Sequence, residues 1–133
     1  MSGEMTVTTT KRTELVDVTE RIREVVAGRP GSLVTLFVPH TTAGIVLQAA
    51  GPGATAVAAD VAAALERLVD EDASWQHVHE GDRNPWSHVR AALTASSVAI
   101  PIVDEELALG DHQAVFLAEF DGPRERRLLV TVT

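Results

Sequence analysis

The chain has 133 residues, no cysteine and a formal net charge of −8 at pH 7. This length predicts a single domain over residues 1–133. The lack of cysteine excludes disulfides and thiolate metal ligands. The acidic balance argues against a nucleic-acid partner, which requires a broad positive surface. We find no basic, apolar leader and no run of roughly 18 apolar residues. We therefore expect a cytoplasmic protein without a membrane partner.

In the first half of the chain, residues 6–10 predict a strand because they are rich in Thr and Val, and residues 15–18 either continue that strand or form a second one. A short helix is expected to follow, with Asp17 as its cap and Gly28 at its end. Two more strands, at 33–38 and 41–48, and an alanine-rich helix over 54–70 complete this half.

The second half opens with a polar connection and a helix from about Pro85 to Ala95, for which Asn84 is the predicted N-cap. Pro101 places the next strand at a sheet edge or a bulge. Asp121-Gly122 predicts a hairpin between the last two strands. The predicted strands of this half are 98–103, 114–120 and 128–133. Because strands outnumber helices without alternating with them, the sequence predicts an α+β fold. We expect a mainly antiparallel β-sandwich with two to three flanking helices.

The segment 79–88 combines groups that suit a binding or catalytic site. His79, Asp82 and His88 offer imidazole and carboxylate ligands for a divalent metal. A helix that starts at Asn84 adds backbone N–H groups and a positive dipole, which attract anions. Asp82 is a candidate general base or metal ligand, or a solvated turn carboxylate. His77 and His79 would point the same way in an extended segment, where they either chelate zinc or are simply solvated.

Other candidate residues lie at the ends of predicted strands. His40 follows a strand and a proline, with the hydroxyls of Thr41 and Thr42 beside it. It either serves a site or bonds only to nearby backbone. Glu119 lies within a strand, where a carboxylate is unfavourable unless it faces water, a partner or a ligand. Arg124 lies at the predicted hairpin with Asp121 and Arg126. These side chains either bind an anion or are simply exposed to solvent.

Five blocks of sequence occur in an order that resembles one family. They are His-Thr-Thr-Ala-Gly-Ile at 40–45, Gly-Asp-x-Asn-Pro-x-x-His at 81–88, Ser-Ser-x-x-Ile-Pro-Ile at 96–102, Leu-x-Leu-Gly-x-x-Gln at 107–113 and Glu-Phe-Asp-Gly-Pro-Arg-x-Arg at 119–126. Together they resemble the YjbQ-like family (UPF0047) of small, uncharacterised bacterial and archaeal proteins, from about residue 5 onward. The resemblance implies an α+β sandwich that assembles as a homotrimer. It also implies a histidine-lined pocket that binds a metal or an anion.

The resemblance further implies a secondary thiamine-phosphate synthase, a transferase that joins a pyrimidine diphosphate to a thiazole phosphate and releases pyrophosphate. Its implied catalytic residues are His40, Asp82 and His88. A zinc or magnesium ion would be held by His40, His79 and His88. The residues implied for a small phosphorylated or anionic ligand are Thr41, Thr42, Asn84, Gln113, Glu119 and Arg124. The alternatives are a trimeric, non-catalytic binding protein for a metal or an anionic metabolite, and a purely structural or regulatory oligomer.

Two positions depart from the family pattern. Ala49 stands where most members have a carboxylate, and His112 stands where they have an aromatic residue. The lost carboxylate weakens any metal-assisted diphosphate chemistry that used it. His112 either adds a ligand or fills the gap.

Overall fold

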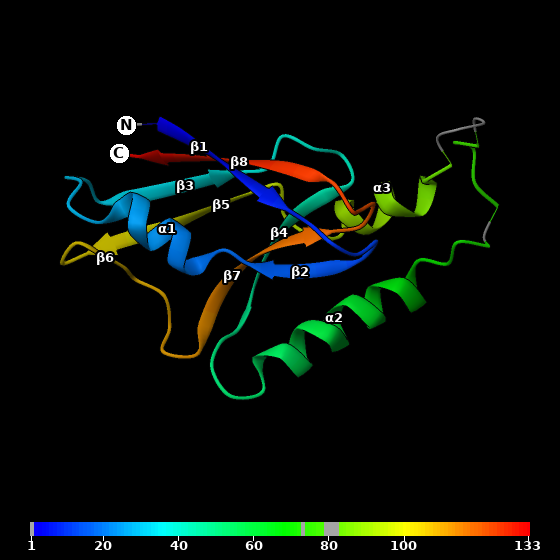
Figure 1. Cartoon of the computed structure of the whole chain (residues 1–133), viewed down its shortest axis with the longest axis horizontal. Coiled ribbons are helices and arrows are strands. Elements are labelled where there is room, and N and C mark those ends of the chain that lie inside the picture. The colour runs from blue at the N-terminus through cyan, green and yellow to red at the C-terminus, as the bar shows by residue number, and fades with distance from the viewer. Residues whose placement is uncertain (1, 73, 79–82) are drawn as a thin grey trace.

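The computed structural model describes residues 2–72, 74–78 and 83–133. Within these ranges the chain forms two antiparallel sheets and three helices (Figure 1). The larger sheet has the order β1 (Ser2–Thr8), β8 (Glu125–Val132), β3 (Leu33–Phe37), β5 (Ser97–Val103) and β6 (Glu106–Leu107). The smaller sheet has the order β2 (Glu14–Asp17), β7 (Gln113–Glu119) and β4 (Ala43–Ala49). The helices are α1 (Thr19–Val26), α2 (Ala54–Leu68) and α3 (Pro85–Ala92). The predicted mainly antiparallel α+β architecture is confirmed.

The core lies between the two sheets, because one face of each strand is apolar. Alternate residues of β3 and β8, such as Leu36 and Leu128, pack with Val115 and Leu117 of β7, and all four are almost completely buried. Helix α1 adds Ile22 to this core.

A second apolar cluster covers the outer face of the smaller sheet. Phe120 and Ala118 pack there with Ala91 of α3, and Leu65 of α2 joins the same cluster. Since β7 is covered on both faces, its sequence is a continuous apolar run rather than an alternating one. Glu119, at the end of β7, is a charged residue in this buried strand.

The predicted hairpin at Asp121-Gly122 is wrong. Strand β7 pairs with β2 and β4, whereas β8 pairs with β1 and β3 in the other sheet. Both strands are hydrogen-bonded along both edges, so neither can accept the other as a neighbour. The connection after Glu119 therefore crosses from one sheet to the other. This crossing brings the end of β7 close to the start of β8.

Helix boundaries differ from the predictions by a few residues. Asp17 accepts hydrogen bonds from the backbone N–H and the hydroxyl of Thr19, at 2.9 and 2.6 Å, so it does support the start of α1. Asn84 occupies the N-cap position of α3, but its side chain makes no capping hydrogen bond. Pro101 lies one strand in from the edge, where β6 pairs only with the last two residues of β5. No helix in the described ranges is long and apolar enough to span a membrane.

Candidate functional site

A buried ion pair holds the two sheets together at the crossing. The side chain of Glu119 is fully buried and that of Arg126 is 5% exposed. Arg126 donates from Nε to Glu119 Oε1 at 2.9 Å and from Nη2 to Glu119 Oε2 at 2.5 Å. Arg126 points toward the core because it lies on the same face of β8 as the buried apolar residues 128, 130 and 132. A two-point contact of this kind fixes the plane of the guanidinium.

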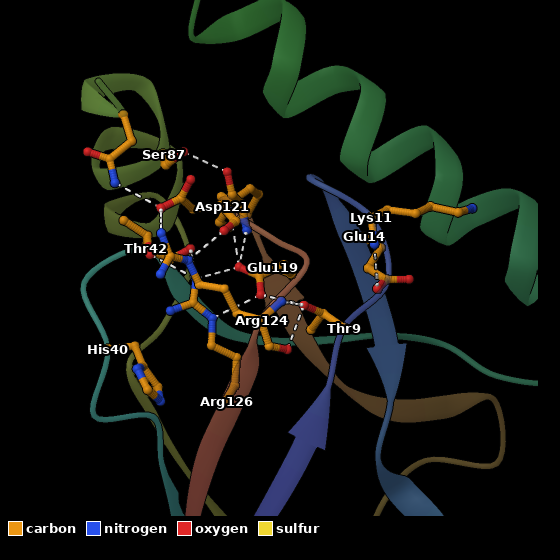
Figure 2. A network of polar contacts seen from close by, with 12 residues as sticks. Thr9, Lys11, Glu14, His40, Thr42, Ser87, Glu119, Asp121, Arg124 and Arg126 are labelled. Atoms are coloured by element: carbon orange, nitrogen blue, oxygen red, sulfur yellow. Dashed lines mark hydrogen bonds and ion pairs between the residues drawn. The ribbon is translucent and has the colours of Figure 1, made fainter. Parts of the chain in front are cut away.

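The pair is surrounded by further hydrogen bonds, which compensate for its removal from water (Figure 2). Thr9 donates its hydroxyl to Glu119 Oε1 at 2.7 Å, and the backbone N–H groups of Phe120 and Asp121 each donate to Oε2 at 3.0 Å. Arg126 Nη2 also donates to the hydroxyl of Thr42 at 2.8 Å. Glu119 thus meets the condition set by the sequence, because it faces a buried cation rather than water.

One side of Arg126 opens onto a surface hollow of about 460 Å³. The hollow is lined by Phe37, Val38, Pro39, His40, Thr41, Thr42, Ser96 and Arg126. Among the described residues, none forms a hydrogen bond with Arg126 Nη1. This nitrogen is therefore the part of the guanidinium that can serve a ligand in the hollow.

His40 lies beside this guanidinium and is held by the backbone of β8. Its Nε2 accepts a hydrogen bond from the backbone N–H of Arg127 at 2.9 Å. Burial, and next the charges of Arg126 and Arg127, lower the pKa of His40 below its ordinary value of 6.5, while Glu119 opposes the shift. The ring is thus neutral at pH 7. Because Nε2 is an acceptor, the proton lies on Nδ1, which makes Nδ1 a donor.

A second hollow, of about 490 Å³, lies next to the N-terminus of α3. It is lined by Trp75, Gln76, His77, Pro85, His88 and Val89. The rings of His77 and His88 pack edge to face, with centroids 5.2 Å apart. His77 Nε2 lies 3.0 Å from Asn84 Oδ1, and Asn84 Nδ2 donates to Asp121 Oδ2 at 2.8 Å.

The structure separates several residues that the sequence grouped together. His40 and His88 line different hollows. His79 and Asp82 lie outside the described residues, so the metal site on His40, His79 and His88 stays a prediction. The described ranges contain no group of three or more His, Asp or Glu residues placed to hold a metal ion. Arg124 pairs with Asp121 at 2.8 Å rather than lining either hollow.

Gln113 lies at the far end of the smaller sheet from the ion pair. In the β4–β7 ladder Ala43 pairs with Glu119, whereas Ala49 pairs with Gln113. Six residues of extended strand span about 20 Å. Gln113 Oε1 accepts a hydrogen bond from the backbone N–H of Gly110 at 3.0 Å, which is a local turn contact. The structure therefore does not bring Gln113 to the site at Glu119, and the departure at Ala49 is equally remote from it.

Two residues have surroundings that the sequence did not predict. Arg126 was considered as an anion-binding or solvated residue of an exposed hairpin, yet it is buried and central to the site. The alternating apolar residues at 128, 130 and 132 carry the signal that would have placed it inward. His77 was considered only as a partner of His79, whereas the structure places it against His88. No local pattern indicated that contact.

Fold and site together define a small α+β sandwich whose two sheets are joined by a buried Glu–Arg pair next to a histidine. The model of the family described as UPF0047 protein YjbQ-like matches residues 3–133. A UPF0047 protein of Archaeoglobus fulgidus is 36% identical over 96% of this chain and 97% of its own length. One of Synechocystis is 37% identical over 98% of this chain and 90% of its own length. The chain belongs to the YjbQ-like (UPF0047) family.

Solved structures share the same fold. A hypothetical protein from Aeropyrum pernix superposes with a TM-score of 0.90 at 30% identity, covering 100% of this chain and 98% of that one. A YbjQ-like protein of unknown function from Sulfolobus solfataricus gives a TM-score of 0.87 at 29% identity, covering 98% of this chain and 94% of that one.

Proposed function

We propose that this protein binds the phosphate or diphosphate group of a small metabolite in the hollow beside His40. We further propose that it acts there as a transferase of the thiamine-phosphate synthase type. The observation that carries the proposal is the guanidinium of Arg126, which Glu119 holds rigidly while Nη1 remains available to a ligand. The hydroxyls of Thr41 and Ser96 line the same hollow. Arginine and hydroxyl donors around one hollow suit a phosphate group.

The local electrostatics favour an anion despite the net charge of −8. At the ring of His40, the charges of Arg126 and Arg127 each act more strongly than that of Glu119. The two arginines therefore disfavour a positive charge on His40 and favour an anion beside it. Nδ1–H of the neutral His40 ring adds a donor that carries no charge of its own.

The proposed reaction needs stabilisation of a leaving group. As the bond between the thiazole phosphate and the pyrimidine forms, the bond from the pyrimidine to its diphosphate breaks, and pyrophosphate leaves with the electron pair. Negative charge grows on the departing oxygen. Arg126 Nη1 and Nδ1–H of His40 are donors that are already oriented by Glu119 and by the backbone of β8, so they stabilise this charge without reorganisation.

A divalent zinc or magnesium ion would add Lewis-acid stabilisation of the diphosphate. The described residues offer two neighbouring imidazoles, His77 and His88, which do not complete a set of three protein ligands. We therefore assign no step to a metal.

The binding part of the proposal is tested by calorimetry with inorganic phosphate and pyrophosphate. We expect saturable binding to the wild type, and at least tenfold weaker binding to His40→Gln and to Ser96→Ala. Thr6→Val, an exposed threonine variant on β1, is the matched control and should bind as the wild type does. The site is refuted if neither anion binds, or if all three variants bind equally well.

The catalytic part is tested by release of pyrophosphate and formation of thiamine phosphate from the two substrates, with and without Mg²⁺ or Zn²⁺. Turnover above background that falls in His40→Gln supports the transferase. Binding of pyrophosphate without turnover supports a second candidate function, a trimeric protein that binds an anionic metabolite without transforming it. That candidate is favoured by the state of Glu119, whose carboxylate accepts five hydrogen bonds and is not available as a base. Native mass spectrometry should show a trimer in either case.

A further inference from the structure

Thr9 contacts the buried ion pair from outside the hollow at His40. It follows β1 directly, is only 2% exposed and does not line the hollow. In Figure 2 it lies on the opposite side of the Glu119–Arg126 pair from His40. Its hydroxyl nevertheless donates to Glu119 Oε1 at 2.7 Å. Thr9 therefore acts on the carboxylate that holds Arg126, and not on the hollow itself.

The two oxygens of Glu119 are held in different ways. The backbone N–H groups of Phe120 and Asp121 both donate to Oε2, each at 3.0 Å. Oε1 accepts from Arg126 Nε at 2.9 Å, and its only other donor among the described residues is Thr9. Without Thr9 the backbone would fix one oxygen alone, and the carboxylate could pivot about it. Such a pivot would tilt the guanidinium, because Arg126 binds both oxygens.

The hydroxyl of Thr9 is itself held in one direction. Its oxygen accepts from the backbone N–H of Arg124 at 2.9 Å, so its proton is left for an acceptor. The charged Glu119 Oε1 at 2.7 Å is a stronger acceptor than the Arg124 carbonyl at 3.1 Å. Gly122 packs against this contact, since a Cβ there would lie 2.8 Å from Thr9 Oγ1 and 2.9 Å from Glu119 Cγ. Because Thr9 is buried, water has little access to replace its hydroxyl.

We propose that Thr9 is a positioning residue for the ligand of the hollow at His40. Thr9 fixes Oε1 of Glu119, and Glu119 fixes the guanidinium of Arg126. Nη1 of that guanidinium is then presented to the ligand in one orientation. A donor that is oriented before the ligand arrives loses less entropy on binding. This inference rests on the proposed function, which assigns the ligand to Arg126 Nη1.

The first test is nitrogen-15 NMR of the arginine side chains in the intact protein without ligand. Rotation about the Nε–Cζ bond exchanges the two Nη groups, so its rate reports how firmly a guanidinium is held. We expect slow rotation of Arg126 in the wild type and faster rotation in Thr9→Val, because Oε1 has lost its anchor. Thr9→Ser keeps the hydroxyl and should restore slow rotation. Arg126→Met assigns the signals.

The second test is calorimetry with inorganic pyrophosphate. Thr9→Val should bind about tenfold more weakly than the wild type, the order of effect expected when a hydrogen bond to a charged group is lost. Thr9→Ser should bind as the wild type does. Thr8→Val makes the same change at the exposed neighbouring position and is the matched control. Ile22→Val removes one buried carbon from the core and controls for lost stability. Both controls should bind as the wild type does.

Equal affinity and equal rotation in the wild type and folded Thr9→Val overturn the inference and leave the proposed function intact. Weaker binding that Thr9→Ser does not restore, or that Ile22→Val shares, also overturns it, since packing alone would then explain the loss. If the wild type binds no pyrophosphate, the proposed function fails, whereas the rotation of Arg126 still decides whether Thr9 orients the guanidinium. If Thr9→Val does not fold, Thr9→Ala, which introduces no larger group, replaces it in both tests.

Discussion

Replacing Arg126 with methionine tests the structural basis of the site. The substitution keeps an unbranched apolar stem but leaves the buried carboxylate of Glu119 without its cation. Glu119 would retain the three hydrogen bonds from Thr9, Phe120 and Asp121 and lose the two from Arg126. Breaking a buried ion pair from one side costs about 3–5 kcal/mol of unfolding free energy. Since domains of this kind have about 5–15 kcal/mol in total, we expect a folded but weakened variant.

Urea denaturation measures this loss. With an m-value of about 2 kcal/mol/M, the midpoint should fall by roughly 2 M. Arg124→Ala is the matched control, because it breaks an ion pair whose arginine side chain is 53% exposed. Exposed pairs contribute less than about 1 kcal/mol. Glu119→Gln combined with Arg126→Met removes the unpaired charge, so the double variant should be more stable than the summed single losses predict, by about 1–3 kcal/mol.

Two results would refute the reasoning. The first is a loss below about 1 kcal/mol in Arg126→Met at an unchanged m-value, which would mean that Glu119 does not depend on its partner. The second is strict additivity of the single and double variants, since residues in direct contact should couple.

Three further predictions concern other parts of the molecule. The pKa of His40 is lowered in the folded state, so the unfolded chain binds a proton at this residue more readily than the folded protein does. The contribution of neutral His40 to stability is therefore complete above pH 6.5 and is lost as pH falls below that value. His40→Gln should flatten this part of the profile of stability against pH, measured by urea denaturation. Gly44→Ala should lower the free energy of unfolding by about 1–3 kcal/mol, because a Cβ there would collide with the Thr94 hydroxyl and the Ala95 carbonyl. Gly3→Ala is the control, since a Cβ at that position meets nothing within 4 Å and should have little steric effect. Thermal melts of the two variants compare them directly. Arg90→Met should make the C-terminal turn of α2 open more often, because Arg90 Nη2 donates a hydrogen bond to the Val69 carbonyl at 2.8 Å. Faster amide hydrogen exchange at residues 66–69 would support this prediction, and unchanged exchange would contradict it.

The amino-acid sequence determined the elements and the family of this protein. Alternating and helical periodicities depend on local spacing, so most strands and all three helices could be located to within a few residues. The ordered motifs at His40, His88 and Glu119 indicated the YjbQ-like family, which the family model confirms. The unfavourable position of Glu119 within a strand correctly marked it as a residue that needs a partner.

Only the tertiary structure decided which segments meet. The Asp121-Gly122 turn signal is local, whereas the hydrogen-bonding edges of β7 and β8 are occupied by strands distant in sequence, so the two strands separate into different sheets. Asn84 has the sequence of a helix cap, but its amide is used by Asp121 and His77, which only the fold brings within reach. Side-chain partners of this kind depend on the packing of the two sheets against each other, and no spacing along the chain encodes them.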